Sequence, residues 1–208
     1  LKLASEFPTS DVSKAVATAT RTVCSGEIIQ SHRKGKFQLD ISEYLKIIRM
    51  KTGELFALSC ELGGSLANAN AIETQALRHY GMALGTAYQI YDDCLDLFGA
   101  ESEAGKSLGT DIAEGKATLP ILLLHEQAGS ELKNKFEKMV VQWDTDQLNI
   151  LRGWLSEFNI LEQSQSNLKT HLDEALGSLE AIEESNERTV LELLPQFLAQ
   201  QFEQLGVS

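Results

Sequence analysis

Proline is scarce in this chain: the 208 residues contain three prolines, Pro8, Pro120 and Pro195, far apart from one another. Proline lacks an amide hydrogen and its ring clashes with the preceding turn, so it bends or ends an α-helix. The long stretches between these positions are rich in alanine, leucine, glutamate and glutamine, which favour helix. We therefore predict an almost entirely α-helical chain, long enough for one domain with a sizeable core.

Apolar residues at helical spacing divide the chain into several predicted helices. The predicted ranges are 12–29, 42–63, 73–98, a helix whose first turn contains Pro120, and amphipathic helices from 131 to the end. The polar segment 31–40 and the Gly63-Gly64 pair predict breaks, and the glycine-rich segment 99–115 predicts a mobile loop. Because we find no linker or internal repeat, we interpret residues 1–208 as a single all-α domain.

Charge and composition argue against two classes of protein. The formal net charge of −12 argues against a nucleic-acid-binding protein, which normally carries a basic face. No run of residues is long and apolar enough for a transmembrane helix. The three cysteines (Cys24, Cys60 and Cys94) lack metal-ligand spacing, so we interpret them as buried free thiols in a reducing compartment. We expect a cytoplasmic protein, unless an organellar leader has been removed.

The sequence YQIYDDCLDLFG, residues 88–99, carries the chemistry of the chain. At about 100° per residue, Gln89, Asp92, Asp93 and Asp96 fall within one arc of a helix. Clustered carboxylates repel one another, and a hard divalent cation removes that cost. Oxygen donors without histidine or thiolate favour magnesium, which commonly shares its ligands with phosphate groups. Taken alone, the pattern is equally typical of a solvated acidic helix face.

Two further segments carry groups that suit a diphosphate. The segment GKSLGTDIAEGKATLP, residues 105–120, places Lys106 and Lys116 ten residues apart in a glycine-rich loop. Each lysine offers a compact charge on a flexible stem, and the glycines let the backbone approach a ligand closely. Upstream, Lys51 and Thr52 offer a charge and a hydroxyl on the helix that precedes the carboxylate helix.

In order and spacing, these segments resemble the polyprenyl synthetase family of trans-isoprenyl diphosphate synthases. The matching sequences are GEIIQ (26–30), YLKIIRMKTGELFALSCELGG (44–64), YGMALGTAYQIYDDCLDLFG (80–99) and GKSLGTDIAEGKATLP (105–120). The resemblance covers about residues 12–128. It implies an all-α helical bundle of the isoprenoid synthase type around a central cavity, and a homodimer.

The resemblance also implies a role for each matched residue. Asp92, Asp93 and Asp96 correspond to the second aspartate-rich motif of the family, which holds Mg²⁺ on the diphosphate; Asp92 and Asp96, one turn apart, are the expected ligands. The diphosphate of the allylic substrate would contact Lys51, Lys106 and Lys116. Thr52 and Gln89 would lie close to the allylic group and its nascent carbocation, and Asp111 would pair with a lysine or a metal-bound water.

The implied reaction is magnesium-dependent head-to-tail prenyl transfer. Isopentenyl diphosphate condenses with an allylic prenyl diphosphate, and diphosphate is released. The protein contributes positioning and electrostatic stabilisation rather than a nucleophile. A terpene cyclase is a weaker alternative, because such enzymes usually carry an Asn/Ser/Glu metal motif where this chain has aspartates.

One part of the family pattern is absent from the 208 residues. The family has a first aspartate-rich motif, followed by two arginines, upstream of the GEIIQ sequence; before Gly26 this chain has two acids, Glu6 and Asp11, and one arginine, Arg21. We interpret the chain as the C-terminal part of such an enzyme, inactive on its own. Two alternatives remain: a partner chain supplies the other half of the site, or the protein is a non-catalytic or regulatory subunit that retains the fold.

Overall fold

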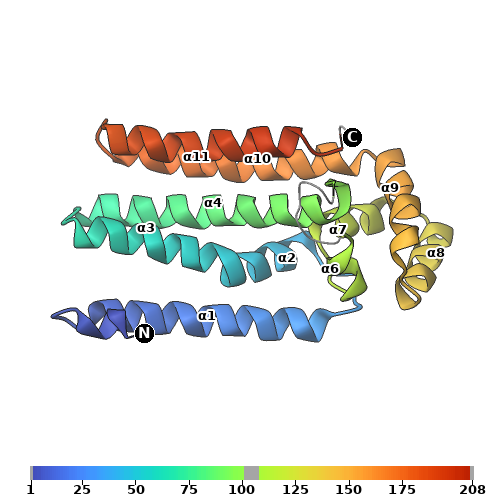
Figure 1. The fold of residues 1–208 in the computed structure, drawn as a ribbon, viewed down its shortest axis with the longest axis horizontal. Coiled ribbons are helices and arrows are strands. Elements are labelled where there is room, and N and C mark those ends of the chain that lie inside the picture. Colours follow the sequence, from blue (N-terminus) through green and yellow to red (C-terminus); the bar gives the residue numbers. More distant parts are fainter. Residues whose placement is uncertain (1, 101–107, 207–208) are drawn as a thin grey trace.

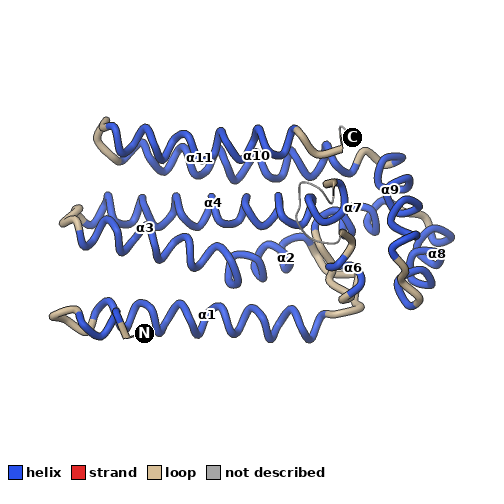
Figure 2. The backbone as a smooth tube through the Cα atoms, viewed as in Figure 1, coloured by secondary structure: helices blue, strands red, loops and turns tan. Residues whose placement is uncertain are grey.

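The structure, a computed structural model, describes residues 2–100 and 108–206, and within these ranges every regular element is a helix. In chain order the elements are η1 (Leu3–Glu6), α1 (Asp11–Arg33), α2 (Ile41–Ile48), η2 (Arg49–Gly53), α3 (Glu54–Leu66), α4 (Ala71–Phe98), α6 (Thr110–Ala113), α7 (Leu119–Gln127), α8 (Ser130–Val141), η3 (Thr145–Gln147), α9 (Leu148–Glu157), α10 (Ile160–Ser178), η4 (Leu179–Ala181) and α11 (Asn186–Glu203). Figure 2 shows the helices in blue and the described connections between them in tan.

Helix α4 is the centre of the bundle. Figure 1 shows α1, α3, α4, α10 and α11 running side by side along the long axis, while α8 and α9 gather at one end. Helix α4 packs against α3 on one side and α10 on the other, and α1 packs against η2 and α3. Its start is fixed by a capping box, in which Asn70 accepts hydrogen bonds from the amides of Ile72 and Glu73 while the Glu73 carboxylate accepts from the Asn70 amide.

Two glycines let α3 and α4 approach each other closely. A Cβ atom on Gly81 would lie 2.4 Å from the carbonyl oxygen of Phe56, and one on Gly85 would lie 2.9 Å from the Cα of Gly53. No larger residue fits at either position unless the backbone shifts. The two helices are also joined by Arg78, which donates to Glu54 at 2.8 Å and to Glu61 at 2.6 Å.

The segment from α2 to α3 forms one helical rod with a wide turn in its middle. Residues Arg49–Gly53 form a π-helix, which is typically a single-turn insertion and frequently occurs at functional sites. Lys51 and Thr52 lie within this turn.

The C-terminal end of α4 is held by a side chain from α9. The guanidinium of Arg152 donates to the carbonyl oxygens of Leu97, at 2.6 Å, and Gly99, at 2.7 Å. These are carbonyls that the end of a helix leaves without an internal partner. The contact fixes the end of the helix that carries the aspartates.

Most of the predicted helices are confirmed, with different ends. Helix α1 continues to Arg33, so that the predicted loop at 31–40 begins later, and α7 contains Pro120 in its first turn as predicted. The predicted stop at Gly63-Gly64 is wrong, because α3 continues to Leu66 and Gly64 packs against Leu77. The prediction of three buried thiols is also wrong, because Cys24 is exposed. The expectation of a mobile loop at 99–115 falls partly on residues 101–107, outside the described ranges.

Candidate functional site

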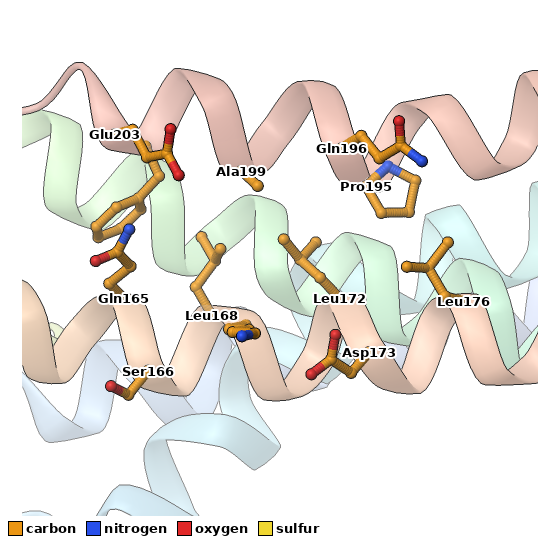
Figure 3. A pocket seen from close by; sticks show the side chains of 12 residues that line it. Gln165, Ser166, Leu168, Leu172, Asp173, Leu176, Pro195, Gln196, Ala199 and Glu203 are labelled. Atoms are coloured by element: carbon orange, nitrogen blue, oxygen red, sulfur yellow. The ribbon is translucent and has the colours of Figure 1, made fainter.

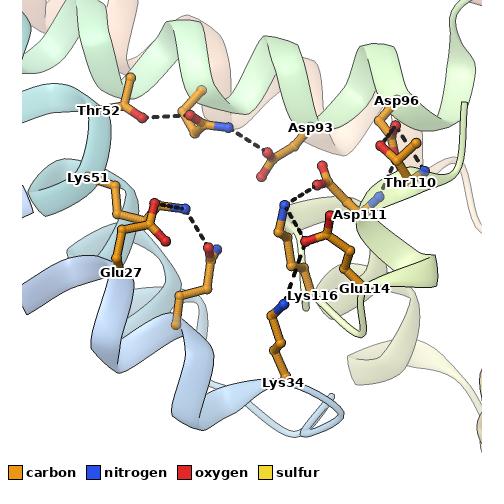
Figure 4. A network of polar contacts seen from close by, with 12 residues as sticks. Glu27, Lys34, Lys51, Thr52, Asp93, Asp96, Thr110, Asp111, Glu114 and Lys116 are labelled. Carbon is orange, nitrogen blue, oxygen red and sulfur yellow. Dashed lines mark hydrogen bonds and ion pairs between the residues drawn. The ribbon is translucent and has the colours of Figure 1, made fainter. Parts of the chain in front are cut away.

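The predicted site residues in the described ranges come from three segments, and α1 adds further side chains beside them. Figure 4 shows Thr52 and Lys51 on η2, the aspartates on α4, Glu27 on α1, and the segment around Asp111 and Lys116. Lys106 belongs to 101–107 and lies outside the described residues.

Asp93 is the buried centre of a chain of hydrogen bonds. Its carboxylate accepts from the hydroxyl of Tyr44, with 2.7 Å between oxygens, and from Nε2 of Gln89 at 2.8 Å. The Oε1 of Gln89 in turn accepts from the hydroxyl of Thr52 at 2.6 Å. This chain ties α2, η2 and α4 together, and it fixes the orientation of the Gln89 amide: its oxygen faces Thr52 and its nitrogen faces Asp93.

The surroundings of Asp93 disfavour its negative charge. Burial, followed by the nearby carboxylate of Asp111, raises the pKa of Asp93 to about 7, although the hydrogen bonds from Tyr44 and Gln89 act in the opposite direction. Asp92 adds a further upward contribution. Burial and the same Asp93 charge raise the pKa of the Tyr44 hydroxyl well above its usual value, so Tyr44 remains a proton donor at neutral pH.

The other two aspartates of the motif occupy different environments. Asp96 is fully buried, and its carboxylate accepts hydrogen bonds from Thr110 and from the amide of Asp111. Burial raises the pKa of Asp96, and the hydrogen bond from the Asp111 amide opposes that shift. Asp92 is partly exposed and therefore has access to solvent.

Each of the two described site lysines forms an ion pair with a nearby acid. Lys51 lies 2.9 Å from the carboxylate of Glu27 and donates to the side-chain oxygen of Gln30, both on α1. Lys116 lies 2.8 Å from Asp111 and 3.2 Å from Glu114. The expected pairing of Asp111 with a lysine is therefore present.

Charge around Lys116 keeps it protonated. Burial lowers the pKa of its ammonium, but the hydrogen bonds and charges of Asp111 and Glu114 outweigh burial, and the net shift is upward. Glu114 also pairs with Lys34, beyond the end of α1, at 3.6 Å. The segment is tied to the same place by its backbone, since the Gly35 amide donates to the carbonyl oxygen of Gly115 at 2.7 Å.

The aspartates do not form a ready-made cage. Within the described ranges, no group of three or more histidine, cysteine, aspartate or glutamate side chains is arranged to hold a metal ion. The raised pKa of Asp93 comes first from burial and then from the charge of Asp111, with a further contribution from Asp92. Such a set of carboxylates suits a hard cation that takes one or two protein oxygens and completes its shell from water or phosphate.

Several residues at this site were missed in the sequence, notably Tyr44, Thr110 and Glu114. The segments containing Tyr44, Glu27 and Gln30 were noted, and Glu27 and Gln30 stand in the GEIIQ sequence. Tyr44 lies two turns before Lys51 on the same rod, but its partner Asp93 is 49 residues away. No local spacing indicates a contact over that distance.

A groove between α10 and α11 lies away from these residues. Figure 3 shows Leu168, Leu172, Leu176, Pro195 and Ala199 along its floor, with Gln165, Asp173 and Glu203 at its edges. Its volume is about 420 Å³. None of the predicted site residues lines it.

The helical bundle with an aspartate-bearing helix at its centre has the all-α fold of isoprenoid synthases. The chain belongs to the polyprenyl synthetase family: the sequence model of that family, described as Polyprenyl synthetase, matches residues 1–152. The match extends beyond the 12–128 range in which the motifs lie. No helix among the described residues is both long and apolar enough to cross a membrane.

Individual relatives agree with this assignment. The chain is 30% identical over 176 residues to heptaprenyl diphosphate synthase component 2 of Bacillus subtilis, a match that covers 85% of this chain and 50% of the relative. The crystal structure of a decaprenyl diphosphate synthase from Rhodobacter capsulatus superposes with a TM-score of 0.85 and 27% identity, over 93% of this chain and 60% of that one. A polyprenyl synthase from Caulobacter crescentus superposes with a TM-score of 0.85 and 32% identity, over 89% and 57%. The chain thus spans about half the length of the curated relatives it matches.

Proposed function

We propose that this chain carries the diphosphate-binding side of a magnesium-dependent prenyl transferase. The reaction would join isopentenyl diphosphate head to tail to an allylic prenyl diphosphate. The observation that carries the proposal is the convergence of carboxylates and lysines from α1, η2, α4 and the 109–116 segment on one side of the bundle (Figure 4). Opposite charges gathered in this way suit a bound metal–diphosphate complex.

The donor set fits magnesium. Among the three predicted ligands, Asp92 is partly exposed and Asp93 is buried beside it, and all donors are oxygens. When bound, the ion would neutralise the charge that develops on the departing diphosphate. The name of the Caulobacter crescentus structure states that it contains calcium and isoprenyl diphosphate, which supports a divalent cation and a prenyl diphosphate on this fold.

The side chains of this protein would bind and orient the substrates. Lys51 and Lys116, with Lys106, would exchange their present acidic partners for diphosphate oxygens. The bond between the allylic carbon and its diphosphate oxygen then breaks, and the double bond of isopentenyl diphosphate forms the new carbon–carbon bond. A proton leaves for the released diphosphate.

Thr52 and Gln89 would face the allylic carbon of the bound substrate. The hydroxyl oxygen of Thr52 has lone pairs that its donation to Gln89 does not use, and its position in the π-helical turn is fixed by that bond. Gln89 is fixed in turn by Asp93. A rigid set of dipoles stabilises a developing positive charge without the cost of reorganisation.

A second candidate follows from the relatives. The Bacillus subtilis protein is named component 2 of a heptaprenyl diphosphate synthase, and this chain contains one aspartate-rich motif. A partner subunit supplying the missing motif, or a non-catalytic regulatory role beside such a subunit, fits both observations. We keep a homodimer and a cytoplasmic location as further proposals; light scattering of the purified chain tests the first.

Prenyl transfer by the purified 208-residue chain tests the proposal. The assay contains magnesium, labelled isopentenyl diphosphate and one of three primers: dimethylallyl, geranyl or farnesyl diphosphate. Calorimetry measures binding of inorganic diphosphate with magnesium in parallel. Asp92→Ala is the test variant, and Asp173→Ala, an exposed acid on α10, is the matched control.

Each outcome has a distinct meaning. Labelled product that is lost in Asp92→Ala would show that the chain is a complete enzyme. Diphosphate binding without product, with product restored by an upstream segment or a partner chain, would show that the chain is one half of a site. Absence of magnesium-dependent diphosphate binding would contradict the proposed function.

A further inference from the structure

The carboxylate of Asp96 is fully engaged with the segment that follows α4. Its Oδ1 accepts from the Thr110 amide at 3.2 Å and from the Thr110 hydroxyl at 2.9 Å, and its Oδ2 accepts from the Asp111 amide at 3.0 Å. Its backbone carbonyl oxygen also accepts from the Gly109 amide at 2.8 Å. Four hydrogen bonds thus join one residue of α4 to three consecutive residues of the segment.

Burial distinguishes Asp96 from Asp92, and its hydrogen-bond partners distinguish it from the buried Asp93. Its exposed fraction is 0%, whereas Asp92 is partly exposed. Figure 4 shows Asp96 beside Thr110, apart from Asp93, which points toward the middle of the polar network. Both oxygens of Asp96 therefore face the backbone of the segment.

The anchored segment leads directly to Lys116. Asp111, whose amide donates to Asp96, accepts with its side chain from the ammonium of Lys116 at 2.8 Å. The Lys116 amide also donates to the Asp111 carbonyl oxygen at 2.9 Å. Two hydrogen-bonded steps therefore connect the carboxylate of Asp96 to the ammonium of Lys116.

The turn at the start of the segment requires glycine and depends on the same anchor. Gly109 has a φ of +71°, which favours glycine, and a Cβ atom there would lie 2.9 Å from the ring of Trp143. After this turn the next two amides, those of Thr110 and Asp111, donate to the Asp96 carboxylate. The turn and the carboxylate together set the path of residues 109–116.

We propose that Asp96 is a positioning residue that anchors the 109–116 segment and so aims Lys116 at the diphosphate, rather than a ligand of the metal ion. This inference rests on the proposed function for the role of Lys116. Asp92 and Asp93 would then be the aspartates that bind the metal ion. The two functions of the motif, holding an ion and holding a loop, then belong to different aspartates of one helix.

The test combines hydrogen exchange with diphosphate binding by the 208-residue chain. Exchange of the Thr110 and Asp111 amides reports the anchor. Calorimetry with inorganic diphosphate at a series of magnesium concentrations reports both the affinity and the half-saturating magnesium concentration. The variants are Asp96→Ala, Lys116→Ala and the two combined, with Asp92→Ala as the metal-site reference and Asp173→Ala as the control.

We expect Asp96→Ala to speed exchange of both amides and to weaken diphosphate binding by about tenfold, the same loss that we expect from Lys116→Ala. The combined variant should bind diphosphate no more weakly than Lys116→Ala alone, because both changes remove the same interaction, that of Lys116 with the diphosphate. The half-saturating magnesium concentration should stay at the wild-type value in Asp96→Ala and rise in Asp92→Ala.

Thr110→Val serves as a second variant that leaves Asp96 in place, in case Asp96→Ala fails to fold. It removes the hydroxyl donor and should weaken diphosphate binding by about threefold. Unchanged binding in Thr110→Val would overturn the inference. So would losses that multiply in the combined variant, or a raised magnesium requirement with normal amide exchange in Asp96→Ala. If the wild-type chain binds no diphosphate, the proposed function fails, and the exchange data still decide whether Asp96 is the anchor.

Discussion

The C-terminal half of α4 has two faces that are held by different interactions, hydrogen bonds on one and apolar packing on the other. On the face toward α2 and η2, Gln89 and Asp93 make short, directional hydrogen bonds to Thr52 and Tyr44. The other side chains of this half include apolar, buried ones such as Ile90 and Leu97, which belong to the same core cluster as Leu168 of α10. One helix therefore presents an ordered polar network on one side and close apolar packing on the other.

This difference between the two faces explains how the fold tolerates a buried polar network. Burial of Asp93 raises its pKa, so the polar face costs folding free energy. The apolar face offsets that cost and, because its side chains interdigitate with α10, fixes the rotation of α4 about its axis. The direction of the carboxylates is thus set from the opposite side of the helix.

The largest expected effect is on the polar face. Replacing Asp92 with alanine should lower prenyl transfer by the complete enzyme by about 1000-fold, or about 4 kcal/mol, because the carboxylate that we propose as an ion ligand is lost. The circular dichroism spectrum and the denaturation midpoint should stay unchanged, since Asp92 is partly exposed. Near-normal turnover in Asp92→Ala would remove the metal-site assignment.

The opposite face should show the reverse pattern. Leu168 of α10 is 1% exposed and belongs to the core cluster that contains Ile90 and Leu97. Leu168→Ala should lower the free energy of unfolding by about 3 kcal/mol, measured by urea denaturation, through lost burial and the cavity left behind. Diphosphate affinity of the folded protein should stay at the wild-type value. Leu193→Ala on α11, at 53% exposure, is the matched control and should change stability by less than about 0.5 kcal/mol.

A smaller effect is expected where α3 and α4 touch. A Cβ atom on Gly81 meets backbone atoms of Phe56 and Ala57, which cannot give way, so Gly81→Ala should cost about 2 kcal/mol of stability. Gly63 has no neighbour within 4 Å of the same added atom, so Gly63→Ala should stabilise helix α3 by up to about 1 kcal/mol. Equal effects of the two changes on the urea midpoint would contradict close packing as the reason for the glycines in α4.

The contrast between these glycines also shows what the sequence could predict. Helical periodicity predicted α4 to within two residues of its start, because periodicity is a local property of the chain. The Gly63-Gly64 pair misled the prediction of the end of α3, since Gly64 is small to admit Leu77 rather than to end the helix. Whether a glycine serves as a stop or as a contact depends on a neighbouring helix that the local sequence does not reveal.

For the site as well, the residues could be predicted from the sequence but their long-range contacts could not. The aspartates and lysines follow from their residue types and spacing, and Asp111 was expected to pair with a lysine. The contact of Tyr44 with Asp93 and that of Asp96 with Thr110 were not predicted. Both depend on the rotation of α4, which the apolar face sets. A helical arc places several carboxylates on one side without showing which of them points at a neighbouring backbone.

The smallest expected effect, taken over a single pH unit, is a pH dependence of stability that originates on the polar face. The pKa of Asp93 is about 7 in the folded protein and has its ordinary value of 3.8 when unfolded. Between these values the folded state holds a proton that the unfolded state has lost, so this group makes stability fall as pH rises. In metal-free buffer with a chelator, the free energy of unfolding should fall by about 1 kcal/mol from pH 5 to pH 6 because of this residue.

Two variants separate this contribution from that of other acids. Asp93→Asn keeps the shape of the side chain but cannot titrate, so it should reduce the slope of stability against pH between 4 and 7. Tyr44→Phe removes a donor that favours the charged carboxylate, so it should raise the pKa of Asp93 and extend the slope to higher pH. If urea denaturation gives the same slope in the wild type and in Asp93→Asn, Asp93 is already ionised in the folded protein. The charge of Asp93 on the polar face of α4 would then not lower the free energy of unfolding. The conclusion that the apolar face offsets a cost of the polar face would be wrong.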